Sequence, residues 1–352
     1  MEKAVYRIID ANFNRAREAV RVIEEYCRFW LNSESLTGRA KQLRHELCTA
    51  VGRLEAGRLI SGRDTAGDVG THISVDNQMQ RGSLKDSFTA AAKRLTEALR
   101  VLAEVIFPLN SDVSGEIERL RYRAYTLEKE VTLWGDSKAG YSGVRLYVVI
   151  TSNLPAEIFS LAQKCIEGGA DCIQLRAKQI EDDKLFAVAE EFVKICKAGG
   201  VLSIINDRVD IAVAADADGV HLGQNDLPVE KAYRLQHKPM IIGKSTHSIE
   251  QLKAAVSEPI TYAALGPVFA TPTKPTAEAV GLGYVTEGLK VLDRTGIGHA
   301  AIGGINIDNV EQLLRAGAKT IAVCRAVTAA RDAACACREL KQKIVEFKSA
   351  DL

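Results

Sequence analysis

The spacing of apolar residues changes near residue 140. Before that point apolar residues recur every three or four positions, the spacing of helices with one buried face, over segments 11–31, 37–60, 84–107 and 113–132. From Arg145 onward, short apolar runs alternate with helical stretches. Residues 133–143 contain three glycines and no periodicity, which predicts a linker. We therefore expect a mostly α-helical domain over 1–132 and a second domain over 144–352.

The second domain contains eight candidate strands, each a short and nearly continuous apolar run. They are Leu146–Ile150, Cys172–Leu175, Leu202–Ile205, Gly219–Leu222, Ile241–Gly243, Tyr262–Leu265, Ala300–Ile302 and Thr320–Val323. Apolar strands that alternate with helices indicate a parallel sheet covered on both faces. Eight such units favour an α/β fold of the closed (β/α)8 type, the TIM barrel, over an open sheet.

Polar residues follow seven consecutive strands at their carboxyl ends, where barrel enzymes carry their chemistry. In chain order they are Gln174, Arg176 and Lys178; Asn206 and Asp207; His221 and Asp226; Lys244, Ser245 and His247; Thr271, Thr273 and Lys274; Gly303 and Gly304; and Cys324 and Arg325. Two carboxylates on neighbouring strand ends suit Mg²⁺, which proteins hold through one or two carboxylates plus substrate phosphates. The cationic and hydroxyl groups suit a diphosphate, and the glycine pair suits a monophosphate. The set predicts a transfer reaction.

Individual members of this set have simpler interpretations. Asn206 and Asp207 are also common turn formers, and His247 is equally suited to beginning a helix. His221 is more often a packed core histidine than a catalyst, and paired glycines occur at many tight turns. The argument therefore depends on the joint arrangement.

Composition adds few constraints. The net charge is +1, so bulk charge attracts neither nucleic acid nor a membrane. The chain has no run of 18 apolar residues, and its first residues are charged without an apolar signal segment. The eight cysteines include no CxxC pair. We expect reduced thiols in a cytoplasmic protein.

The helical domain contains an internal repeat. Residues Arg15, Glu18 and Arg21 recur as Arg94, Glu97 and Arg100, and Glu25 recurs as Glu104, each 79 positions later (94 minus 15). Each set lies on one side of its helix. These charged stripes suit solvated faces with ion pairs along the helix, or two faces that converge on an anionic ligand. The polar segment 61–71 supplies Arg63, Asp64 and Asp68 as further candidate ligands of phosphate or Mg²⁺.

At these residues the second domain resembles thiamine phosphate synthase across about 145–345. The matching segments are LYVVIT, IQLRAK, IINDRVDIA, ADGVHLGQNDLP, IGKSTHS, YAALGPVFATPTK and AIGGINIDN. The resemblance implies a barrel that joins hydroxymethylpyrimidine diphosphate to hydroxyethylthiazole phosphate, with release of pyrophosphate.

The same resemblance implies roles for single residues. Gln174, Arg176, Lys178 and Asn206 would bind the pyrimidine diphosphate, and Asp207 and Asp226 would hold Mg²⁺. Ser245 and Lys274 would meet the pyrophosphate, with Arg176, Lys178 and Lys274 stabilising it as it leaves. Thr271 and Thr273 would lie at the thiazole phosphate, whose phosphate the turns at Gly303-Gly304 and Cys324-Arg325 would bind. Two positions depart from the family, which usually has an acid at Ala177 and often serine at Arg325.

The first domain resembles the monofunctional hydroxymethylpyrimidine phosphate kinase family. The residues that carry this resemblance are Asn12-x-Asn14-Arg15-x-x-Glu18, Arg63-Asp64, Asp68-Val-Gly70 and Arg94-x-x-Glu97. A kinase here would use ATP to make the diphosphate that the barrel consumes, although the chain has no GxxxxGK[ST] loop. A rival interpretation combines an isomerase barrel of the thiazole tautomerase type with a non-catalytic assembly module. A homo-oligomer is compatible with either.

Overall fold

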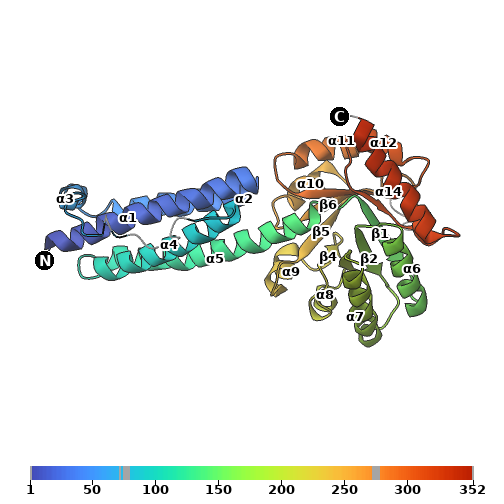
Figure 1. The fold of residues 1–352 in the computed structure, drawn as a ribbon, viewed down its shortest axis with the longest axis horizontal. Coiled ribbons are helices and arrows are strands. Elements are labelled where there is room, and N and C mark those ends of the chain that lie inside the picture. Colours follow the sequence, from blue (N-terminus) through green and yellow to red (C-terminus); the bar gives the residue numbers. More distant parts are fainter. Residues whose placement is uncertain (1, 71–72, 74–79, 272–277, 351–352) are drawn as a thin grey trace. The chain divides into compact units, whose positions relative to one another are not determined.

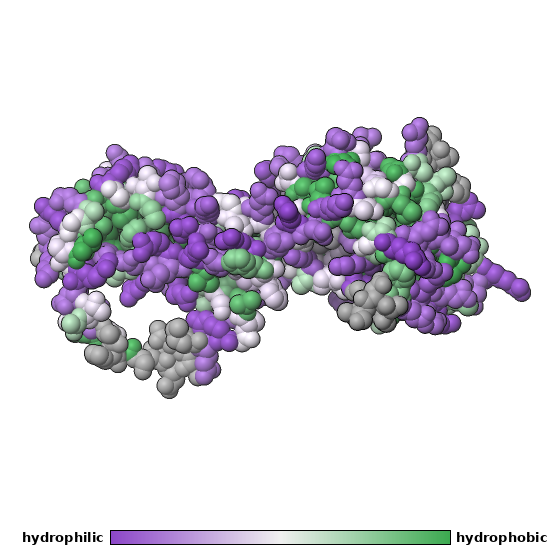
Figure 2. All heavy atoms as spheres, turned by 90° about the horizontal axis from the view of Figure 1, so that it is seen from above, coloured by the Kyte–Doolittle hydropathy of each residue, from purple (hydrophilic) through white to green (hydrophobic). Residues whose placement is uncertain are grey.

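The computed structural model describes residues 2–70, 73, 80–271 and 278–350, and the side chains of 348–350 are left aside. The chain divides into two compact units, Met1–Thr132 and Leu133–Leu352 (Figure 1). Within the described residues, no helix has both the length and the apolar character needed to cross a membrane. The surface seen in Figure 2 is largely hydrophilic, with apolar side chains gathered in smaller areas.

The first unit is helical, as predicted. Its elements are α1 (Glu2–Glu25), the π-helical turn η1 (Tyr26–Trp30), α2 (Glu34–Val51), α3 (Ala56–Gly62), α4 (Leu84–Ile106) and the first part of α5 (Ser111–Tyr141). Helices α1 and α4 pack together through their apolar stripes, which include the fully buried Ile9, Val20 and Leu99. The helix predicted over 37–60 is two helices, because α2 ends at Val51 and α3 begins at Ala56.

The expected linker over 133–143 is wrong for most of its length, because residues 133–141 form the last turns of α5. Trp134 and Tyr141 on these turns are buried within the second unit. The Trp134 indole Nε1 donates to the carbonyl of Ile260 at 2.9 Å, and the Tyr141 ring stacks on Tyr262 with 4.4 Å between centroids. This packing outweighs the roughly 1 kcal/mol that a glycine such as Gly140 costs inside a helix.

The second unit is the predicted eight-stranded barrel. Its strands are β1 (Leu146–Thr151), β2 (Cys172–Arg176), β3 (Leu202–Asn206), β4 (Gly219–Leu222), β5 (Ile241–Thr246), β6 (Tyr262–Leu265), β7 (Gly298–Ile302) and β8 (Ile321–Val323). Neighbouring strands are parallel, and β1 pairs with β8 to close the barrel. The strand predictions are confirmed.

Helices cover the outside of the barrel (Figure 1). They are α6 (Pro155–Glu167), α7 (Asp182–Ala198), α8 (Val209–Ala214), α9 (Val229–Leu235), α10 (Ile249–Ala255), α11 (Gly281–Leu292), α12 (Val310–Arg315), α13 (Arg325–Thr328) and α14 (Ala333–Ala350). Because side chains alternate along a strand, Val148 of β1 packs outward with the helices, whereas its neighbour Tyr147 points into the barrel. The same alternation decides which residues at the strand ends face the interior.

Candidate active site

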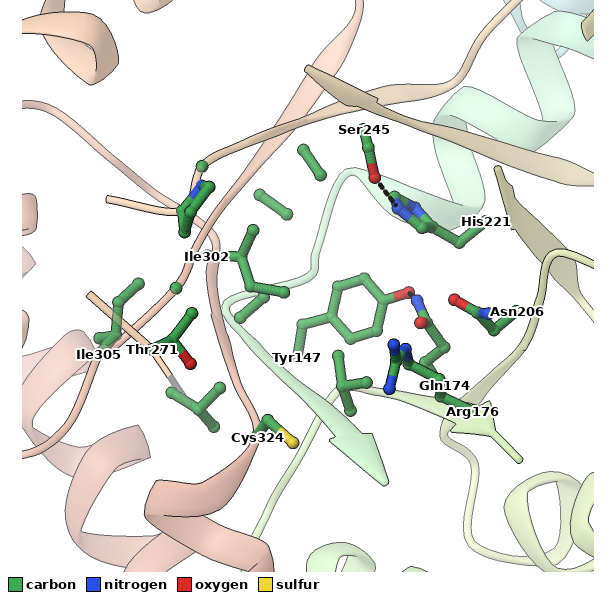
Figure 3. A pocket seen from close by; sticks show the side chains of 18 of the residues that line it. Tyr147, Gln174, Arg176, Asn206, His221, Ser245, Thr271, Ile302, Ile305 and Cys324 are labelled. Atoms are coloured by element: carbon green, nitrogen blue, oxygen red, sulfur yellow. Dashed lines mark hydrogen bonds between the residues drawn. The ribbon is translucent and has the colours of Figure 1, made fainter. Parts of the chain in front are cut away.

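One cavity of about 680 Å³ opens among the carboxyl ends of the barrel strands, and Figure 3 shows it from close by. Twelve of the predicted site residues line it together. They are Gln174, Arg176, Lys178, Asn206, Asp207, Asp226, Ser245, Thr271, Gly303, Gly304, Cys324 and Arg325. Thr273 and Lys274 lie outside the described residues. The chain thus gathers into one cavity polar residues that lie up to 151 positions apart in sequence (325 minus 174).

Strand alternation separates two candidates of β5. Ser245 lines the cavity, whereas the adjacent Lys244 lies on the other side of the strand, where its Nζ donates to the carbonyl of Gly223 at 2.9 Å. Lys244 is buried there. Of these two residues, Ser245 is therefore the one that reaches the cavity.

The two aspartates form a carboxylate pair at one side of the cavity. Asp207 has a left-handed backbone with φ of 64°, and its N–H donates to the carbonyl of His221 at 2.8 Å. The Lys178 ammonium lies 3.0 Å from the Asp207 carboxylate. Asp226 accepts a hydrogen bond from the N–H of Gly223 at 2.6 Å. Both aspartates line the cavity.

The electrostatics of the pair differ between its members. Burial is the largest influence on Asp207 and raises its pKa, but the hydrogen bond with Asp226 and the Lys178 ammonium together bring that pKa below the ordinary value. Burial raises the pKa of Asp226, and the neighbouring Asp207 charge raises it further. Two close carboxylates of this kind share a proton or a cation. The donor set fits a hard divalent ion such as Mg²⁺.

The glycine pair that follows β7 lies against the loop after β6. Gly303 and Gly304 have φ values of 108° and 65°. A Cβ on Gly303 would come within 2.4 Å of the Pro267 Cα, and one on Gly304 within 2.6 Å of the Ala270 carbonyl oxygen. Only glycine fits either position, so the turn exposes backbone rather than side chain to the cavity. Arg325 opens α13 on the neighbouring strand end, and its side chain is exposed.

Sequence reasoning missed two tyrosines at the floor of the cavity, Tyr147 and Tyr262. Gln174 Nε2 donates to the Tyr147 hydroxyl at 2.6 Å, and the two tyrosine hydroxyls are 2.9 Å apart. His221 Nδ1 lies 2.9 Å from the Tyr262 hydroxyl. Its Nε2 lies 2.9 Å from Ser245 Oγ (Figure 3). Both tyrosines belong to apolar runs that predict core strands. Their inward register in a closed barrel is the signal that could have identified them.

Both interpretations of His221 and His247, as a structural residue and as a site residue, apply in the structure. His221 is partly buried and hydrogen-bonded on both ring nitrogens, yet it lines the cavity. His247 also lines the cavity, and its Nδ1 hydrogen-bonds with the carbonyl of Gly266. Helix α10 begins just after His247, with Ser248 as its N-cap. Each residue therefore combines a structural position with access to the site.

The charged stripes of the helical unit lie on its surface. Arg15, Glu18, Arg94 and Glu97 are exposed. Arg21 pairs with Glu25 at 2.7 Å, and Arg100 pairs with Glu104 at 2.6 Å. Stripes that converged on a ligand should be partly buried, but the arginine side chains of these two pairs are 51% and 56% exposed. Within this chain they form solvated faces with ion pairs along the helix.

A buried charge of the helical unit lies away from these stripes, at Asp10 of α1. Asp10 accepts hydrogen bonds from Arg63 Nε at 2.8 Å and Nη2 at 2.7 Å, and the carboxylate is only 10% exposed. Asn14 Nδ2 also donates to Asp10, at 3.2 Å. The pair raises the pKa of Arg63 through the hydrogen bond to Asp10. A candidate named from sequence, Arg63, is therefore anchored to α1 by a residue that sequence reasoning did not select.

The two aspartates of the loop after Arg63 accept hydrogen bonds from backbone N–H groups. Asp64 accepts from the N–H of Gly67 and Asp68 from the N–H of Gly70, each at 2.9 Å. Over the described part of both units, no cluster of three or more His, Cys, Asp or Glu side chains is placed to hold a metal ion.

Comparison with known proteins agrees with this geometry. The family model described as thiamine monophosphate synthase matches residues 146–327, more than half of the chain. The chain belongs to this family. A second model, described as the ThiD2 family, matches residues 7–130. The two matches fall on the two compact units.

Relatives extend the likeness over both units. A thiamine-phosphate synthase of Thermosynechococcus vestitus is 37% identical, with 96% of this chain and 94% of the relative covered. One from Nostoc is 40% identical, covering 93% and 90%. The solved thiamine phosphate pyrophosphorylase of Pyrococcus furiosus is 33% identical, with a TM-score of 0.54 over 58% of this chain and 96% of that one. The two-unit arrangement is thus shared with named synthases.

Proposed function

We propose that the barrel condenses hydroxymethylpyrimidine diphosphate with hydroxyethylthiazole phosphate, and that the helical unit makes the diphosphate from the monophosphate and ATP. The observation that carries the first activity is the cavity itself, which brings cationic groups, a carboxylate pair and a glycine turn to one mouth. An isomerase would need no diphosphate site. The names of the relatives, which span more than nine-tenths of this chain, favour the synthase as well.

In the proposed reaction the pyrimidine C–O bond to the diphosphate breaks, and the thiazole nitrogen forms a new bond to the exocyclic carbon. Arg176 and Lys178 line the cavity where they can neutralise the leaving pyrophosphate. Lys274 is proposed for the same role. Because the attacking nitrogen carries no proton, the step needs no general base. Positioning of the two substrates then supplies much of the acceleration.

Asp207 and Asp226 are proposed to hold Mg²⁺. When bound, the ion would add positive charge beside the diphosphate. The two carboxylates come from neighbouring strand ends, and despite burial Asp226 and the Lys178 ammonium bring the pKa of Asp207 below its ordinary value. Gln174 and Asn206, which line the same cavity, would orient the pyrimidine.

The thiazole phosphate is assigned to the other end of the cavity. Gly303 and Gly304 place backbone there, and Thr271 lines the same cavity. Backbone N–H groups bind phosphate without a counter-charge. Thr273 would complete this end.

The kinase assignment rests on the ThiD2 match and on the barrel's need for a diphosphate. The Asp10–Arg63 pair is the most strongly organised charged feature near the predicted loop. Asp10 fixes the guanidinium in place, which suits a phosphate ligand. The exposed stripes with Arg15, Glu18, Arg21, Arg94, Glu97 and Arg100 would contribute through a ligand or a second copy of the unit.

Product analysis tests both activities together. Full-length protein is supplied with the pyrimidine monophosphate, ATP, Mg²⁺ and thiazole phosphate, and products are identified by mass spectrometry. We expect thiamine phosphate, pyrophosphate and ADP. Thiamine phosphate that forms only when diphosphate is supplied would contradict the kinase and favour an assembly module. No thiamine phosphate from either substrate would contradict the synthase.

Arg325 should act at the thiazole phosphate. The residue follows β8, beside the Gly303-Gly304 turn after β7, and both line the same cavity. We expect Arg325→Ser to raise the KM for thiazole phosphate by about 10-fold, the loss of one charge-assisted hydrogen bond. Initial rates at varied concentrations of each substrate measure this. The reverse pattern, with the effect on the pyrimidine diphosphate, would refute the assignment.

A further inference from the structure

A chain of hydrogen bonds crosses the floor of the cavity and joins two proposed substrate ligands. It runs from Gln174 through the hydroxyls of Tyr147 and Tyr262 to His221 and on to Ser245. The four links measure 2.6, 2.9, 2.9 and 2.9 Å. Both tyrosines are at most 2% exposed, and Gln174 and Ser245 are also buried although they line the cavity.

Each group in this chain of hydrogen bonds has few protons to donate, so all of its donors point in the same direction along the chain. Gln174 Nε2 donates to Tyr147, which leaves the single Tyr147 proton for Tyr262. Tyr262 then donates to His221 Nδ1, and a neutral imidazole must carry its proton on Nε2. That proton goes to Ser245 Oγ, so the serine's own proton is left for the cavity.

The opposite direction would suit the substrates poorly. In that arrangement Ser245 would donate to His221, and its oxygen would present only lone pairs to a diphosphate. An anion is bound by donors and repelled by lone pairs. Burial raises the pKa of Tyr147 and of Tyr262 well above the ordinary value, so both hydroxyls keep their protons at neutral pH.

We propose that Tyr147 and Tyr262 are positioning residues that hold His221 as the Nε2–H tautomer, so that Ser245 donates to the diphosphate and Gln174 presents its carbonyl oxygen to the pyrimidine. This assignment rests on the proposed roles of Ser245 and Gln174. Neither tyrosine hydroxyl supplies a proton to the reaction. They act through the two groups at the ends of the chain.

The test uses Tyr262→Phe in two backgrounds of the full-length protein. Removing this hydroxyl frees His221 to carry its proton on Nδ1 and to accept from Ser245. We expect kcat to fall by about 10- to 100-fold in the otherwise unchanged protein. In the Ser245→Ala background the same change should lower kcat less than about twofold, because the group it orients is absent.

Tyr141→Phe is the matched control. Tyr141 is equally buried and stacks on the Tyr262 ring, but its hydroxyl donates outside the chain, to the carbonyl of His299 at 3.2 Å. We expect its kcat to stay within about twofold of the parent. Tyr147→Phe removes the acceptor for Gln174 and should instead raise the KM for the pyrimidine diphosphate.

The tautomer itself is read by nitrogen NMR of histidine-labelled protein, with His221 assigned by substitution. We expect the Nε2–H form in the parent and a gain of the Nδ1–H form in Tyr262→Phe. An Nδ1–H form in the parent, or equal losses of kcat in both backgrounds, would overturn the proposal. Unchanged turnover of Ser245→Ala alone would instead refute the serine's proposed role, and the tautomer would still decide the direction of the chain.

Discussion

Replacing Asp207 or Asp226 with asparagine should lower synthase turnover by at least about 100-fold, equivalent to roughly 2.7 kcal/mol of transition-state stabilisation. The two carboxylates line one side of the cavity, and the Lys178 ammonium lies 3.0 Å from the Asp207 carboxylate. An amide keeps the shape of the carboxylate but loses the charge that attracts a hard cation. The loss should be greatest at limiting Mg²⁺.

Pyrophosphate release at several Mg²⁺ concentrations measures this effect. Asp210→Asn is the matched control, because Asp210 lies three residues after Asp207 but is exposed and pairs with Arg208 at 2.6 Å. That control should retain most of its activity. Both site variants should unfold at temperatures close to the parent's, since the pair lies in loops above a packed barrel. Near-parental turnover of either site variant at limiting Mg²⁺ would rule out the metal assignment.

Replacing Arg63 with alanine should reduce pyrimidine monophosphate phosphorylation by about 100-fold while the barrel still makes thiamine phosphate from supplied diphosphate. Arg63 donates two hydrogen bonds to Asp10, which hold it in place, and it is the arginine of the loop predicted to bind phosphate. Its removal deletes a donor and leaves a buried carboxylate without its main partner. The two activities are assayed separately on the same full-length preparation.

Arg53→Ala provides the control for this change. Arg53 is a partly exposed arginine of the same unit and pairs with Glu116. We expect it to keep both activities. A second variant, Asp10→Asn, separates folding from chemistry, because the amide can still accept from Arg63. Full phosphorylation by Arg63→Ala would remove the 61–71 segment from the proposed kinase site.

Part of the site follows from chain order alone. In a parallel barrel every strand ends at the same rim, so residues such as Gln174, Asp207 and Gly303 can be assigned to one mouth without coordinates. The apolar runs that mark the strands are long enough to be unambiguous. Chain order does not determine which of two adjacent residues faces inward, because that depends on register within the closed barrel. Lys244 and Ser245 illustrate this.

Periodicity failed where packing opposed it. Residues 133–141 contain glycine and lack an amphipathic pattern, yet they are helical because Trp134 and Tyr141 are buried against the barrel strands. The charged stripes show a different limit, because periodicity placed these residues correctly but did not decide their burial. A repeat at a constant offset placed Arg21 and Arg100 on equivalent helix faces, but only the packing of α1 against α4 decided that those faces are exposed.

The sequence by itself determined the two domains' fold classes, the eight strands and most of the cavity lining, because these depend on local periodicity and on the order of elements. Tertiary structure decided the pairing of Asp10 with Arg63, 53 positions apart, and the chain from Gln174 to Ser245. Those contacts form only when distant segments close on one another. Tyr147 and Tyr262 are apolar-strand residues in the sequence, and only barrel closure brings their hydroxyls within 2.9 Å.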